Sequence, residues 1–430
     1  MLGSLNQPTP SNSSTQPHPH PQSHPAPLNR YPPLLLAVDG GGSGVRAVIA
    51  SHAGVELARA SAGPCNVKSV TAPVAVTRIL QAVNAALTLV PLSGDETRPG
   101  PQGRTPDAVP SLTSDTDQEQ SSLMGHCFAK AWVGVAGVDS RTQGSDFEDL
   151  LRQALRMATT DLILTNDGHL FAAASTSLPH VDATVVMCAG TGSVSLAFRI
   201  HPTTREPKLV ACRGGWGPVL GDEGSAYSIG RLGIRSVLSY FDELYMASAG
   251  KGPTPPKPHR TCLMFGAILR YFGATTSEGL IDRIYSDCST PQASHETESR
   301  RKIWIADSAR IVLEHAFPAI VECVESKRTA LGILAEAQAY LIDVVLLFVD
   351  QLRLDLHRTV LTLGGSLWTN SGFAQMFLER LEATQCVFKH VIIASDTAGP
   401  AAVSLAQRSK RTADAPTQKA DELELHNKIR

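Results

Sequence analysis

The chain of 430 residues has 38 Lys and Arg against 40 Asp and Glu, and this near-neutral balance gives no basic footprint for nucleic acid or for an acidic membrane. Because 43% of its residues are hydrophobic, it can bury more than one core, and two domains are expected. Its eight cysteines stand singly, without the spacing of a zinc or iron–sulfur site, which favours reduced thiols in the cytoplasm. A small-molecule partner fits this composition best.

The N-terminal third of the chain alternates structured and polar segments. Residues 1–33, rich in Pro, Ser, His and Gln, predict a disordered leader without the apolar core of a signal peptide. Strands are expected at 34–38 and 45–50, on either side of a glycine cluster, and a helix at 71–89. Pro, Gly, Ser, Thr and Asp dominate residues 91–122, which predict a disordered insertion.

The remainder of the chain reads as alternating buried strands and helices, the pattern of an α/β fold. A capping box, Ser145 with Glu148, opens a helix that should end near residue 158, and a long helix is expected at 328–354. The longest apolar run of the chain, near residues 340–349, is too short to span a bilayer, because Asp343 interrupts it. Further strands are expected at 131–137, 162–165, 183–188, 193–200 and 359–363, and a flexible tail at 407–430.

The first motif with chemical potential is A-V-D-G-G-G-S-G-V-R-A-V, at residues 37–48. A turn built from Gly41, Gly42 and Ser43 can bring backbone N–H groups and a hydroxyl against phosphate oxygens. Asp39 would face the same anion, and a carboxylate beside a polyphosphate implies a cation between them, Mg²⁺ held through water. Taken alone, the motif also fits an ordinary glycine-rich hairpin.

A second strand ends in a similar turn, M-C-A-G-T-G-S-V-S, at residues 187–195. Here Gly190, Thr191 and Gly192 repeat the glycine-and-hydroxyl pattern of the first motif. Two such hairpins can hold a polyphosphate from both sides, which a single loop cannot do. The pair is therefore a stronger indication of nucleotide binding than either turn.

A glycine-rich loop, G-G-W-G-P-V-L-G-D-E-G-S-A-Y-S-I-G, follows at residues 214–230. Two acids in such a loop favour a polar ligand, and sugar hydroxyls are suitable donors to a carboxylate, so Asp222 is the candidate sugar-binding residue. The alternative is that Asp222 and Glu223 favour the positive N-terminus of the following helix, with Trp216 as a core residue.

Four further residues, in three segments, can be interpreted in two ways. Asp167, in L-I-L-T-N-D-G-H-L-F, stands at a junction of strand and helix, where it could accept a proton from an alcohol or cap the helix. Gly364 and Gly365 follow a strand and could let an adenine or ribose lie against the backbone, or form a plain turn. Asn66, in A-G-P-C-N-V, also fits a turn.

The motifs of P-loop enzymes and protein kinases are absent, so phosphoryl transfer would need another scaffold. With these turns in this order, residues 34–405 resemble the superfamily of sugar kinases, heat-shock ATPases and actin. Within it, they resemble the N-acetylglucosamine kinases of the BadF/BadG/BcrA/BcrD-type ATPase family. The most specific part of the resemblance is G-G-W-G-P-V-L-G-D-E-G-S-A-Y.

The resemblance implies two RNase H-like α/β domains around a central nucleotide and sugar cleft. The domains would cover residues 34–160 and 161–395, and a helix at 396–406 would return to the first. ATP and Mg²⁺ are the implied cofactors, and an amino sugar is the implied partner, with a homodimer left open. The implied phosphate and adenosine positions are Gly41, Gly42, Ser43, Gly190, Thr191, Gly192, Gly364, Gly365 and Ser366. The implied sugar positions are Asn66, Gly215, Trp216, Gly217 and Asp222. Asp167 is the implied base and is also implied to contact the substrate, and Asp39 is implied to hold the metal through water.

The implied reaction is phosphorylation of N-acetylglucosamine at its 6-hydroxyl. Val194 stands where some N-acetylglucosamine kinases have an asparagine, and His169 follows the base where small apolar residues are more usual. Glucosamine or another hexosamine therefore stays open as the substrate. A non-catalytic sugar sensor is the alternative of another class, and the scattered cysteines argue against the redox ATPases of the same family.

Overall fold

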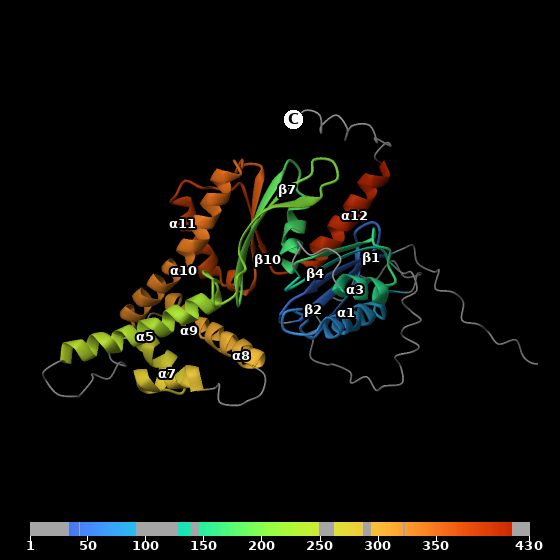
Figure 1. Cartoon of the computed structure of the whole chain (residues 1–430). Coiled ribbons are helices and arrows are strands. Elements are labelled where there is room, and N and C mark those ends of the chain that lie inside the picture. Colours follow the sequence, from blue (N-terminus) through green and yellow to red (C-terminus); the bar gives the residue numbers. More distant parts are fainter. Residues whose placement is uncertain are drawn as a thin grey trace, which may run out of the picture.

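The structure is a computed structural model that describes residues 34–42, 44–91, 128–138, 146–248, 262–286, 294–320 and 323–414. Within these residues the strands form two five-stranded sheets, which Figure 1 shows beside each other. Ser43, Ser145, the leader, the insertion from residue 92 and the tail from residue 415 lie outside the described residues. The two sheets confirm the α/β fold class.

The first sheet has the order β3-β2-β1-β4-β5. Its first three strands form an antiparallel meander, and β4 and β5 run parallel to β1. Helices α1 and α3 pack on one face of the sheet, and α12 packs on the other. These elements are β1 (Leu34–Gly40), β2 (Val45–Ala50), β3 (Glu56–Ala62), β4 (Phe128–Val135), β5 (Leu162–Thr165), α1 (Ala72–Leu87), α3 (Asp146–Leu155) and α12 (Ala398–Asp414).

The second sheet repeats this topology, with the order β10-β9-β6-β7-β8. Again an antiparallel meander is followed by two strands parallel to its first strand. The repeat places the ends of β1 and β6 at equivalent positions, and each of these strands runs into a glycine turn. The strands are β6 (Ala183–Ala189), β7 (Ser193–Ile200), β8 (Pro207–Gly214), β9 (Thr359–Gly364) and β10 (His390–Ala394).

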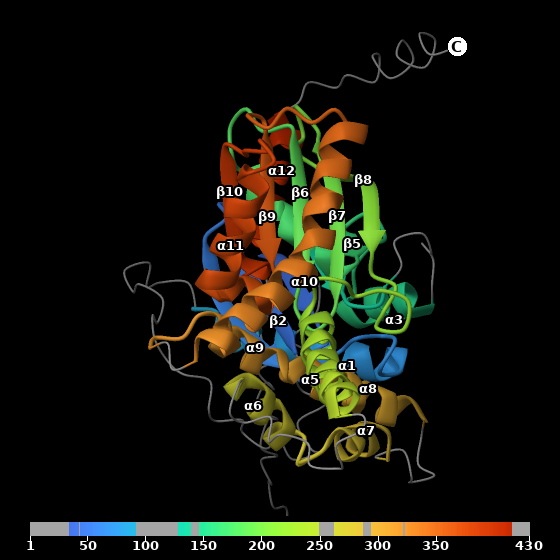
Figure 2. The same cartoon turned by 90° about the vertical axis from the view of Figure 1, so that its left-hand side faces the viewer.

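Two short helical segments link the sheets, and a set of longer helices follows β8. Helices α10 and α11 lie against the second sheet (Figure 2), whereas α5 to α9 gather beyond its end (Figure 1). By length and composition α10 could cross a membrane, but its apolar residues form part of this core. The helices are η1 (Asp167–Ala172), α4 (Ala173–Thr176), α5 (Ala226–Ser248), α6 (Leu263–Tyr271), α7 (Ser277–Ser286), α8 (Ser294–Asp307), α9 (Ala309–Ala316), α10 (Val324–Gln351), η3 (Ser366–Thr369) and α11 (Ser371–Glu382).

Two predicted boundaries differ from the observed arrangement. Strand β5 pairs with β4 in the first sheet, although residues 161–395 were expected to form the second domain. The last helix continues to Asp414, through residues expected to belong to a flexible tail. It continues because Arg408 forms an ion pair with Glu206 and Arg411 donates to the Thr203 carbonyl, both in the loop before β8. The other domain boundaries stay a prediction.

Candidate active site

Asp167 lies where β5 ends and η1 begins. The cap of η1 is Asn166, whose side chain accepts the Gly168 N–H at 3.0 Å, although the same N–H also lies 3.1 Å from Asp167 Oδ1. On β4, a Cβ at Gly134 would lie 3.2 Å from the Asp167 Cα, so glycine at this position allows η1 to approach the sheet closely. The backbone of Asp167 is thus fixed by its neighbours, and capping alone does not account for its carboxylate.

Segment η1 also packs against the second sheet. The ring of Phe171 lies against Gly364 of β9, and a Cβ at Gly168 would lie 2.8 Å from the Leu196 Cδ1 of β7. His169 packs edge-on against Phe198 at 5.1 Å between ring centroids, and burial lowers its pKa to about 4, so the ring is neutral at pH 7. Asp167 therefore lies where the two sheets meet.

Asp39, at the end of β1, is a close electrostatic neighbour of Asp167. Burial, and after it the charge of Asp39, raise the pKa of Asp167 to about 6, and hydrogen bonds from backbone N–H groups oppose the rise. The pKa of Asp39 is also raised, chiefly by burial, although a hydrogen bond from Thr397 and the charge of Arg46 oppose the rise. Two carboxylates that repel each other in a crowded site are typical of functional sites.

Thr397, immediately before α12, is a site residue that the sequence did not indicate. Its hydroxyl donates to Asp39 Oδ2 at 2.6 Å, across 358 positions of the chain. Threonine carries no signal of such a role, because hydroxyl residues before a helix are usually explained as caps. The hydrogen bond connects the last helix to the first glycine motif.

The first glycine turn is compact but open on its outer side. The Gly41 N–H donates to the Gly44 carbonyl at 2.8 Å, and the Cys65 N–H donates to the Gly41 carbonyl at 3.1 Å. A Cβ at Gly42 would meet no atom within 4 Å, so a ligand could approach this backbone closely. The predicted phosphate contact Ser43 lies outside the described residues.

The second glycine turn lies beside the turn after β9, as the pairing of β6 with β9 requires. The Gly190 N–H donates to the Gly192 carbonyl at 2.9 Å, and Ser366 Oγ lies 3.6 Å from a Cβ at Gly190. Gly365 has a φ of +101°, and a Cβ there would lie 2.5 Å from the Ala189 carbonyl oxygen, so this turn requires glycine. The ring of Phe171 lies on the side of Gly364 where a Cβ would stand, and the predicted adenosine contact at Gly364 stays a prediction.

The glycine-rich loop 214–224 is joined to the second turn through Asp222. The carboxylate is only 4% exposed, accepts the Ser193 N–H at 3.1 Å and pairs with Lys302 Nζ at 2.9 Å. A Cβ at Gly192 would lie 2.8 Å from Asp222 Oδ1, so the glycine makes room for the acid. This ion pair, rather than the N-terminus of α5, accounts for the buried charge.

Lys302, on α8, is a second residue that the sequence did not indicate. It stands in a mostly polar helix, where a single lysine is indistinguishable from a solvated one. Glu223 has a different role from its neighbour, because it pairs with Arg231 at 2.9 Å and accepts the Ser228 hydroxyl. The two acids of the motif are thus held by two different helices.

The predicted sugar contacts fall into two groups. The side-chain oxygen of Asn66 accepts the Lys68 N–H at 2.9 Å and lies against Gly137. Val138, the residue after Gly137, accepts a hydrogen bond from the Asn166 side chain at its carbonyl oxygen. Asn66 is therefore connected to the segment that carries Asp167. Trp216, Gly215 and Gly217 lie in the loop that follows β8 of the second sheet. The Trp216 side chain is 57% exposed and lies against Gly221, so Trp216 is not a core residue.

The donor groups near Asp39 suit a hydrated magnesium ion. Mg²⁺ usually keeps several waters and is held by one or two carboxylates together with substrate phosphates. Asp39 and Asp167 provide adjacent carboxylates whose repulsion a divalent cation would relieve. The described residues contain no group of three or more His, Cys, Asp or Glu that could hold a metal without such help. The residues fit a cation bound through water and phosphate.

Comparison with known proteins gives one family and several relatives. Residues 36–399 match the model of the BadF/BadG/BcrA/BcrD ATPase family. An N-acetylmuramic acid/N-acetylglucosamine kinase of Clostridium acetobutylicum is 29% identical over 153 residues, or 36% of this chain and 42% of that protein. An N-acetyl-D-glucosamine kinase of Dictyostelium discoideum is 26% identical over 215 residues, or 49% and 56%. The chain spans about half the length of these curated relatives.

Two solved structures share the fold at low identity. A candidate N-acetylglucosamine kinase from Chromobacterium violaceum has a TM-score of 0.51 at 18% identity, covering 87% of this chain and 99% of that one. Another, from Porphyromonas gingivalis, has a TM-score of 0.50 at 19% identity, covering 89% and 100%. With the repeated sheet topology, they confirm the two-domain, actin-like fold. Because the family match covers most of its length, this chain belongs to the BadF/BadG/BcrA/BcrD ATPase family.

Proposed function

We propose that this protein is an ATP-dependent sugar kinase, and that it phosphorylates N-acetylglucosamine at the 6-hydroxyl in amino-sugar salvage. The observation that carries the proposal is the Asp39 and Asp167 pair where the two sheets meet, with the pKa of Asp167 raised to about 6. A base of this pKa is ionised at pH 7 yet basic enough to accept a proton from an alcohol. The names of the two curated relatives support the sugar class.

In the proposed reaction, the 6-hydroxyl oxygen attacks the γ-phosphorus as the bond to ADP breaks, and Asp167 accepts the hydroxyl proton. Backbone N–H groups of the two glycine turns stabilise charge on the phosphate oxygens. Magnesium, held near Asp39 through water, neutralises phosphate charge when bound. The phosphates and adenosine would contact Gly41, Gly42, Ser43, Gly190, Thr191, Gly192, Gly364, Gly365 and Ser366. The sugar would contact Asn66, Gly215, Trp216, Gly217 and Asp222.

The pH dependence of kcat/KM should report the ionisation of Asp167. Only the carboxylate accepts a proton, so the rate should fall as pH decreases through about 6, the raised pKa of this residue. Because Asp39 interacts with Asp167, the acid limb is a property of the pair. Steady-state rates between pH 4.5 and 8 test this expectation. A rate that stays constant down to pH 4.5 would argue against Asp167 as the base.

The identity of the sugar is tested by measuring ADP release with Mg²⁺-ATP and a panel of acceptors. The panel comprises N-acetylglucosamine, N-acetylmuramic acid, glucosamine, N-acetylmannosamine and glucose. The highest kcat/KM on N-acetylglucosamine is expected. A preference for glucosamine would keep the kinase and change its substrate, an alternative suggested by the apolar Val194 against Gly215. Sugar binding by calorimetry without turnover on any acceptor would favour a sensor instead.

A further inference from the structure

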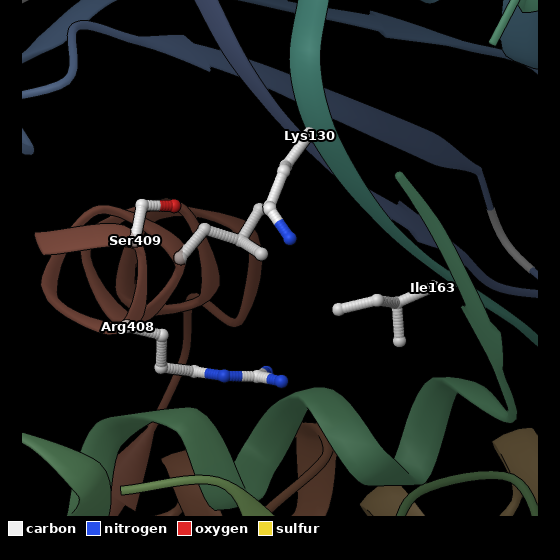
Figure 3. Close-up of a pocket in the computed structure, with 5 residues that line it drawn as sticks. Lys130, Ile163, Arg408 and Ser409 are labelled. Atoms are coloured by element: carbon white, nitrogen blue, oxygen red, sulfur yellow. The ribbon is translucent and has the colours of Figure 1, made fainter. Parts of the chain in front are cut away.

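A small cavity lies between α12 and the first sheet, away from the glycine turns. Its volume is about 60 Å³, and it is lined by Lys130 of β4, Ile163 of β5 and Leu405, Arg408 and Ser409 of α12. Figure 3 shows the ammonium end of Lys130 and the guanidinium of Arg408 pointing into the space beside Ile163. A single water needs about 10–15 Å³, so this cavity has room for a small polyatomic ion.

The charges around the cavity favour an anion. Arg408 pairs with Glu206 at 2.8 Å, but Lys130 has no carboxylate partner among the described residues. Arg205, next to Glu206 in the chain, is buried and donates to three backbone carbonyls. Burial and the positive charge of Arg411 both lower the pKa of Arg205. The carboxylates of Glu206 and Asp182 lie near this group of four cations, Lys130, Arg205, Arg408 and Arg411, and Asp182 also pairs with Arg358.

Ser409 adds a donor to this cationic surrounding. Its hydroxyl oxygen is buried and has no hydrogen-bond partner among the described residues. Because a buried hydroxyl without a partner is destabilising, a polar ligand in the adjoining cavity would be favoured. Ile163 and Leu405 supply apolar walls, which reduce water access and strengthen the electrostatic attraction.

We propose that this cavity is a binding site for a tetrahedral oxyanion, either inorganic phosphate or the phosphate group of a sugar phosphate. Lys130 would supply a point charge, Ser409 would donate its hydroxyl, and Arg408 would donate N–H groups beside its ion pair with Glu206. The site lies toward the C-terminal part of the helix whose N-terminal side carries Thr397, the partner of Asp39. A bound anion would fasten α12 to β4 and β5.

The test measures phosphate binding while an ATP analogue occupies the two glycine turns. Thermal unfolding of the full chain is followed in saturating Mg²⁺ and a non-hydrolysable ATP analogue, while inorganic phosphate replaces chloride at constant ionic strength. Wild type should show a saturable rise in Tm. A Lys130→Gln variant should bind phosphate at least tenfold more weakly, and Ser409→Ala should also weaken it. Lys410→Gln, an exposed lysine next to the site that does not line the cavity, should behave as wild type.

A repeat with N-acetylglucosamine 6-phosphate distinguishes the two sources of the phosphate group. Tighter binding that is also lost in Lys130→Gln would assign the site to a sugar phosphate, whereas equal affinities would assign it to the free anion. A linear response to phosphate, or equal affinity in wild type and Lys130→Gln, would overturn the proposal. Because the readout is binding, the result does not depend on kinase turnover.

Discussion

An Asp167→Asn variant is expected to lose about 10²–10⁴-fold in kcat on N-acetylglucosamine while it still binds ATP and sugar. Asparagine keeps the shape of the side chain, and the cap of η1 is supplied by Asn166, so the local backbone should be retained. Only the proton acceptor is removed. Single-turnover rates and calorimetric affinities for both substrates measure the two halves of this expectation.

The same variant should be more stable than wild type at alkaline pH. Folding raises the pKa of Asp167 from 3.8 to about 6, so this group's contribution to stability is complete below pH 3.8 and is lost as pH rises through 6. Removing the charge should recover up to about 3 kcal/mol at pH 8, a rise of several degrees in Tm, and nothing near pH 4. Equal Tm values for wild type and Asp167→Asn at pH 8 would contradict a destabilising charge on the buried Asp167 carboxylate. The matched control is Asp242→Asn, a variant of an exposed aspartate.

A Lys302→Met variant should destabilise the protein and weaken its affinity for the sugar. Methionine keeps the length of the side chain but leaves the Asp222 carboxylate, which is 4% exposed, without its cation. Removing one partner of a buried pair costs about 3–5 kcal/mol, and the partial exposure of Lys302 favours the lower figure. If Asp222 binds a sugar hydroxyl, its displacement should raise KM about 10–100-fold, with a smaller effect on kcat.

A double variant separates the structural and binding consequences of this ion pair. In Lys302→Met/Asp222→Asn the uncompensated charge is gone, so most of the lost stability should return while the sugar KM stays high. Lys302→Arg should restore both properties in part, and Lys389→Met, an exposed lysine, is the control. An unchanged Tm in Lys302→Met would show that the pair contributes little. A double variant with normal KM would remove Asp222 from the sugar site.

The central strands and their turns could be predicted from the sequence because their signals are local. Strands β1, β2, β6, β7 and β9 are nearly continuous buried runs, and the motifs that end β1, β6 and β9 carry their own glycines. Strands β3, β8 and β10 were not predicted. They lie at or near sheet edges with alternating exposed and half-buried residues, which leaves a weak hydrophobic pattern.

The partners of the site carboxylates could not be predicted, because each comes from a distant segment without a motif. Thr397 reaches Asp39 only when the last helix packs on the first sheet, and Lys302 reaches Asp222 only when α8 packs beside α5. The electrostatic interaction between Asp39 and Asp167 likewise follows from β1, β4 and β5 lying side by side. Topology, rather than composition, determines these contacts.

Helix α12 bears on how the protein folds during synthesis. One face of the first sheet, including Leu35, Val48 and Trp132, is covered by residues that are translated long after the sheet itself, among them Ala402 and Leu405. At about 5–20 residues per second, roughly 20–70 s separate translation of the sheet's first strand from that of its cover. During this interval the nascent chain presents an apolar surface that a chaperone could hold. A stop codon shortly before residue 398 would make that exposure permanent.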